Sequence, residues 1–285
     1  MPSSILAAEA PAGGAAMDQV AFATVSASVL TVFLLWIGVR YRAGGMAWLR
    51  SLGAFSSRVS GMPAWAAIAG ALGGGALLLA LFGMYWDISL HIDKGRDEGP
   101  LANPAHYAIL FGLYGLLAAG VLSVFMADEE RPSPAAVKIA DGWHAPLGGV
   151  LMVACGSYAL LGFPLDDVWH RIFGQDVTLW GPTHLMLIGG AVMGLVGLCV
   201  LIAEGRRTPS PAATSPFAAL AAQSRTIGLM GGLLVGLATF QAEFDWGVPQ
   251  FNLLLEPVLL AASAGIGLVC ARMYLGPGGA IAATL

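Results

Sequence analysis

Residues 63–126 read PAWAAIAGALGGGALLLALFGMYWDISLHIDKGRDEGPLANPAHYAILFGLYGLLAAGVLSVFM. Two apolar runs flank a short polar segment in this stretch. The segment holds one histidine and several acidic residues, and a second histidine opens the run that follows. An α-helix needs about 20 apolar residues to cross the hydrocarbon core of a bilayer, and each run is long enough. The stretch therefore predicts a helical hairpin that crosses the membrane, turns in a polar loop and crosses back.

Similar apolar runs recur along the whole chain of 285 residues. We count seven, at about 20–39, 63–84, 104–126, 144–163, 182–203, 226–241 and 251–271. Charged residues make up only 11% of the chain, against about 25% in soluble domains. The sequence thus predicts an all-α, polytopic integral membrane protein in contact with the lipid bilayer. The first run lacks a basic flank and is too long for a secretory leader, so we interpret it as a retained span.

The seven spans divide into one leading helix and three hairpins of the same orientation. We expect a flexible outer segment at 1–19, a first span with a basic cytoplasmic loop at 20–62, hairpins at 63–126, 144–203 and 226–272, and a C-terminal segment at 273–285. The connections 127–143 and 204–225 are rich in proline, serine and charged residues, which is typical of linkers. The apolar end of the chain fits a protein that continues into further spans.

The basic residues are unevenly divided between the two sides of these spans. One side has only three, Lys94, Arg96 and Arg171. The other side has ten: Arg40, Arg42, Arg50, Arg58, Arg131, Lys138, Arg206, Arg207, Arg225 and Arg272. Since basic residues concentrate in cytoplasmic loops, we expect the N-terminus outside and the C-terminus in the cytoplasm, in a bacterial inner (plasma) membrane. The outer loops are acidic, which favours cations over nucleic acid as their partners.

One spacing of aspartate and histidine occurs twice, and both copies fall in outer loops. The copies are Asp87, His91, Asp97 and His106, then Asp166, His170, Asp176 and His184. The first three positions of the copies are 79 residues apart, and His144 is the one histidine that matches neither. Asp and His four residues apart share one face of a helix, and the last His of each copy opens the next span. Each copy therefore predicts a metal site between two adjacent helices.

The third hairpin carries a weaker trace of the same spacing. Asp245 lies a further 79 residues after the second copy, close to Glu243, but no histidine follows it. We interpret this hairpin as a degenerate repeat.

Two imidazoles and one carboxylate are suitable ligands for copper, zinc or non-haem iron. We expect Asp87, His91 and His106 to bind one ion, and the corresponding residues of the second copy to bind another, although all six could share one dinuclear centre. Further carboxylates can orient the ligating imidazoles. We assign that role to Asp97, Asp176, Asp167 and Asp93. Pro164 is expected in the first turn of a short helix that carries the second Asp and His.

The second copy also resembles a known metal-site segment. Residues 166–184 read DDVWHRIFGQDVTLWGPTH. This is similar to the C subunit of particulate methane and ammonia monooxygenases, which has an Asp, a Trp-His four residues on, and a Pro-Ser-His at the next membrane helix. Here Gln175 stands in place of an arginine, Thr183 in place of the serine, and the loop is one residue longer. The resemblance implies copper bound by Asp166, His170 and His184.

These features leave the activity open. A copper-dependent oxidoreductase of the monooxygenase type would need other membrane subunits or a second copy, and a copper-handling protein would not. A membrane hydrolase that uses zinc to activate water is an alternative. A cation transporter is another, since Glu256 is predicted to lie inside the last span, where carboxylates are rare. A haem protein with His106 and His184 as axial ligands is the fourth. No catalytic residue is assigned.

Overall fold

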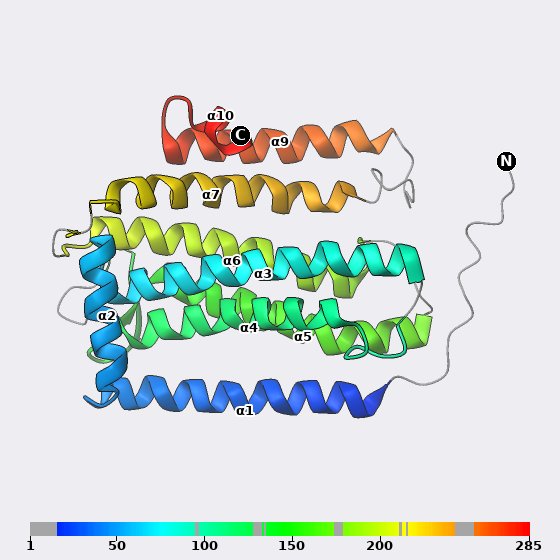
Figure 1. The fold of residues 1–285 in the computed structure, drawn as a ribbon, viewed down its shortest axis with the longest axis horizontal. Helices are drawn as coiled ribbons and strands as arrows, with labels where there is room; N and C mark the ends of the chain where they lie inside the picture. The colour runs from blue at the N-terminus through cyan, green and yellow to red at the C-terminus, as the bar shows by residue number, and fades with distance from the viewer. Residues whose placement is uncertain are drawn as a thin grey trace, which may run out of the picture.

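The computed structural model describes residues 16–94, 97–127, 133, 135–173, 179–210, 213–214, 216–242 and 254–285. It confirms an all-α protein in which seven helices are long and apolar enough to cross a membrane (Figure 1). These helices are α1 (Met17–Arg42), α3 (Ala64–Lys94), α4 (Pro104–Phe125), α5 (Leu147–Phe173), α6 (Pro182–Arg207), α7 (Ala218–Ala238) and α9 (Leu255–Leu275). A 3-10 turn, η1 (Thr239–Gln241), continues α7.

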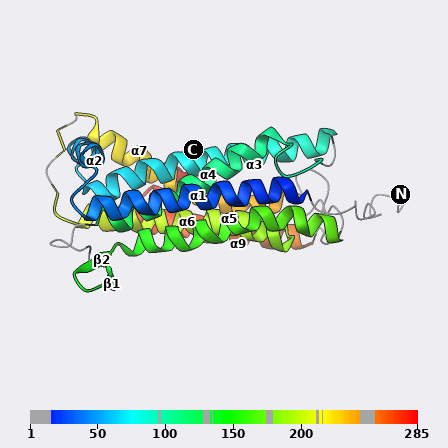
Figure 2. The ribbon, with the colours of Figure 1, turned by 90° about the horizontal axis from the view of Figure 1, so that it is seen from below.

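The helices form one leading helix and three hairpins, as predicted. The hairpins α3–α4 and α5–α6 make up the centre of the bundle, with α1 on one side and α7–α9 on the other (Figures 1 and 2). Leu116, Met152, Leu198 and Leu201 are fully buried where the two central hairpins meet. Glycines let these helices approach closely, as small residues do in membranes. A side chain at Gly148 of α5, for example, would place its Cβ 2.2 Å from the backbone nitrogen of Leu201.

The expected basic loop after the first span contains a helix that we did not predict. Helix α2 (Ala47–Ser60) lies across one end of the bundle, roughly perpendicular to the spans (Figure 1). It buries Leu49 and Gly53 against the bundle and exposes Trp48, Leu52 and Phe55. At 14 residues it is too short to be recognised as a span.

Other boundaries also differ from the predicted ones. The linker 127–143 contains a short antiparallel pair, β1 (Val137–Ala140) and β2 (Trp143–Ala145). Residues 17–19 already belong to α1, and a short helix α10 (Gly279–Thr284) follows α9. The prediction of a separate short helix that begins near Pro164 is wrong, because α5 continues through this proline from Leu147 to Phe173. Proline is tolerated inside membrane helices when neighbouring helices compensate for its missing donor.

Candidate metal centres

The first motif is brought together by the ends of α3 and α4. Helix α3 runs past its apolar stretch to Lys94, so Asp87 and His91 lie one turn apart on the same face. The chain then returns through Asp97, and α4 begins at Pro104 with His106 in its first turn. Proline suits the first position of a helix because the N–H that it lacks would have no partner there.

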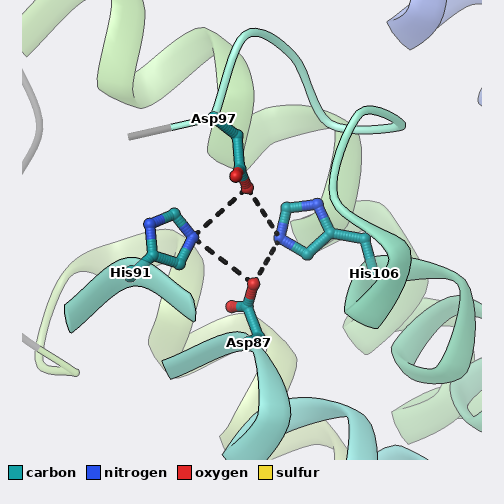
Figure 3. Close-up of side chains that lie close together, drawn as sticks. All are labelled: Asp87, His91, Asp97 and His106. Atoms are coloured by element: carbon teal, nitrogen blue, oxygen red, sulfur yellow. Dashed lines mark ion pairs between the residues drawn. The ribbon is translucent and has the colours of Figure 1, made fainter. Parts of the chain in front are cut away.

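Four side chains of this motif point toward one another (Figure 3). His91 Nε2 lies 3.3 Å from Asp87 Oδ1 and 3.3 Å from Asp97 Oδ2. His106 Nε2 lies 3.0 Å and 3.6 Å from the same two oxygens. Imidazole nitrogens and carboxylate oxygens therefore alternate around a common centre. We call Asp87, His91, Asp97 and His106 the first cluster.

These separations suit a small four-coordinate metal ion. Zinc–nitrogen and zinc–oxygen bonds are about 2.0–2.1 Å long, which puts neighbouring ligands of a tetrahedral site about 3.3 Å apart. The four separations in the first cluster lie between 3.0 and 3.6 Å. All four donor atoms also lie within 4.8 Å of one another. Asp97 was expected to orient a ligand, but its Oδ2 is itself within 3.6 Å of both imidazole nitrogens, so it can serve as a ligand.

Further hydrogen bonds hold the first cluster in place. Asn103 donates from Nδ2 to Asp87 Oδ1 at 2.6 Å and to Asp97 Oδ2 at 3.0 Å. Its Oδ1 accepts from the Ala105 backbone nitrogen at 2.9 Å, which caps α4. Nδ1 of His106 is 2.7 Å from the Pro100 carbonyl oxygen and donates its proton there, so Nε2 is the ring nitrogen that faces the two carboxylates. Asn103 is not part of the repeated Asp and His spacing, so that spacing does not identify it as a member of the site.

Asp97 is held as a carboxylate. Burial alone would raise its pKa, but hydrogen bonds from His91 and Asn103, with the charges of the two histidines, lower it below the usual value. An ionised Asp97 at neutral pH is available to a cation without first losing a proton.

The second motif is brought together in the same way by the ends of α5 and α6. Asp166 Oδ2 lies 3.5 Å from His170 Nε2, and Oδ1 lies 3.4 Å from His184 Nε2. Thr183 donates to Asp166 Oδ1 at 2.5 Å. His170 is buried, with 8% of its surface exposed. We call Asp166, His170 and His184 the second cluster.

The remaining candidates lie elsewhere. Asp167 accepts from the Ala16 backbone nitrogen and lies 3.5 Å from Arg171 Nε, so it faces α1 rather than an imidazole. Asp93 is exposed and belongs to neither cluster. Glu256 lies in the first turn of α9, at one end of the last candidate span. Asp176, Glu243 and Asp245 lie outside the described residues.

The two clusters are separate but lie in contacting hairpins. The donor atoms within each cluster lie within 4.8 Å of one another, so each cluster can hold an ion of its own. Arg171 Nη2 donates to the Glu98 carbonyl oxygen at 2.8 Å, and so ties the second hairpin to the loop of the first. The ring of His106 meets Phe163 of α5 edge-on, with 5.5 Å between ring centroids.

No known protein family, curated protein or solved structure matches this chain. The site's own chemistry therefore carries the functional argument. Imidazole and carboxylate donors bind zinc, copper and iron, and each cluster presents them at the mouth of a helical hairpin. Such a centre can hold and exchange an ion, or polarise a bound ligand.

Proposed function

We propose that the protein is an integral membrane protein that binds one transition-metal ion in each of the two clusters, with copper as the metal. The observation that carries the proposal is the alternation of imidazole nitrogens and carboxylate oxygens, 3.0–3.6 Å apart, in the first cluster. Asn103 and the Pro100 carbonyl support it, because they orient ligands as outer groups do in metal sites.

Copper is supported by the resemblance of residues 166–184 to the monooxygenase C subunit. The spacing of the first cluster is also that of tetrahedral zinc, so zinc is the competing metal, and iron(II) shares the same donors. A site for copper at the outer face suits either a copper-handling protein or a monooxygenase-like subunit. The second of these needs an electron donor and partner subunits.

The test is the metal content of the purified full-length protein, measured by mass spectrometry after loading with copper, zinc or iron(II). Wild type is compared with His91→Ala and His170→Ala. The matched control is His144→Ala, since His144 lies on β2 and in neither cluster. We expect two copper ions per chain in wild type and in the control, and one in each cluster variant.

Other results would redirect or overturn the proposal. Retention of zinc in place of copper would support the zinc hydrolase and would contradict copper as the metal. Loss of both ions in each variant points to one shared centre. A wild-type protein that retains none of the three metals contradicts metal binding altogether.

A further inference from the structure

Three arginines gather at the end of the bundle opposite the two clusters. Arg206 and Arg207 lie in the last turn of α6, and Arg225 lies about two turns into α7. Figure 1 shows these ends of α6 and α7 next to each other, on the side of α2. Among the described residues, none of the three forms an ion pair with a carboxylate, although Arg171 and Lys138 do.

The side chain of Arg206 lies beside that of Arg225. Arg206 Nη2 donates to the Ala222 carbonyl oxygen at 3.1 Å and to the Thr226 hydroxyl, on the turn of α7 that contains Arg225. Tyr274, near the end of α9, donates from its hydroxyl to the Cys199 carbonyl oxygen of α6 at 3.0 Å, so α9 packs beside the other two helices. The ends of three spans therefore enclose a region of positive charge.

Arg225 lacks a good acceptor among the described residues. There its Nε is buried without a hydrogen-bond partner, and its Nη2 donates to the sulfur of Met62, a weak acceptor, at 3.7 Å. A buried donor without a partner is unfavourable, and it is more so on a charged group beside another cation. An anion between Arg206 and Arg225 would relieve both penalties.

We propose that Arg206, Arg207 and Arg225 form a binding site for the phosphate group of an anionic phospholipid. Guanidinium groups bind phosphate oxygens through paired N–H donors. The ends of membrane spans lie at the depth of lipid headgroups, and basic pockets between spans are suited to such headgroups. A lipid is favoured over free phosphate because Arg206 and Arg207 are exposed in the last turn of a candidate membrane span. This inference does not depend on metal binding.

The proposal is tested by native mass spectrometry and thermal unfolding of the full chain in detergent. Phosphatidylglycerol, phosphatidylcholine and inorganic phosphate are added separately to wild type, Arg225→Gln, Arg206→Gln and Arg58→Gln. Arg58 is the control, because it is an exposed arginine of α2 at the same end of the bundle. We expect wild type and Arg58→Gln to retain phosphatidylglycerol about tenfold better than phosphatidylcholine. Arg225→Gln and Arg206→Gln should both lose this preference.

Unfolding without added lipid separates binding from folding. Arg225→Gln should be at least as stable as wild type there, because it removes an unpaired charge. If inorganic phosphate alone stabilises wild type but not Arg225→Gln, the phosphate site is supported. The ligand would then be a free anion and not a lipid. Equal binding of the two lipids, or the same loss in Arg58→Gln as in Arg225→Gln, would overturn the proposal.

Discussion

Asn103 belongs both to a helix and to a candidate metal site. Its side-chain oxygen Oδ1 caps α4, while its side-chain nitrogen Nδ2 donates to both aspartates of the first cluster. We predict that Asn103→Ala lowers metal affinity at this cluster by about 10–100-fold, because the two carboxylates lose their common donor. The measurement is a competition titration with a metal chelator.

The second cluster provides the comparison for this variant. Thr183→Val removes the hydroxyl that donates to Asp166, and so should weaken the second cluster while leaving the first unchanged. If Asn103→Ala weakens both clusters equally, the loss reflects general unfolding and not the contacts described here.

Glu204 is the buried carboxylate that sequence reasoning did not single out. It is 4% exposed, and its oxygens accept from the Leu147 and Gly148 backbone nitrogens at 3.0 and 2.8 Å. These are among the N–H groups that the first turn of α5 leaves without helical partners. We predict that Glu204→Ala lowers the free energy of unfolding by about 1–3 kcal/mol.

Denaturant titration in detergent micelles measures this effect. Glu256→Ala is the control, since Glu256 sits half-buried in the first turn of α9 and should contribute less than about 1 kcal/mol. Equal stability of the two variants would show that the cap on α5 contributes little.

The contact between α5 and α6 depends on glycine at one position and not at another. A Cβ at Gly148 would meet the backbone of Leu201, whereas a Cβ at Gly189 would meet nothing within 4 Å. We predict that Gly148→Ala destabilises the protein by about 1–3 kcal/mol and that Gly189→Ala is tolerated. Thermal unfolding of the two variants checks this, and a stable Gly148→Ala would mean that the helices can separate at no cost.

The helices were predictable from composition, but their ends were not. Apolar length alone predicts all seven spans. It stops the second span at residue 84, whereas α3 continues to Lys94, because His106 of α4 pairs with Asp87 and Asp97 of the loop pairs with His91. Helix α2 was missed because its apolar residues form one face and not a continuous run. The ligand sets followed from spacing, but the contacts of Asn103 depend on how the loop closes.

The whole molecule has a predicted orientation that labelling can test. Residues 93 and 141 are exposed. Residue 93 precedes the candidate span α4 in the sequence and residue 141 follows it, so the two are predicted on opposite faces of the membrane. We predict that Asp93→Cys reacts with an impermeant thiol reagent on intact cells, and that Asp141→Cys reacts only after permeabilisation. Both variants are made in a background without Cys155, Cys199 and Cys270, which serves as the unlabelled control. Reaction of Asp141→Cys alone on intact cells would show that the protein has the opposite orientation to the predicted one.

Each ligand set is contained within a single hairpin, at residues 87–106 and 166–184. This has a consequence for biosynthesis. A chain is made from its N-terminus, and the first set is complete once α4 has been synthesised, before any residue of α5 exists. Under the proposed function, the first cluster can therefore take up its ion on the growing chain. The hydrogen bond from Arg171 to Glu98 forms only later, and it then closes the second hairpin onto the finished loop of the first.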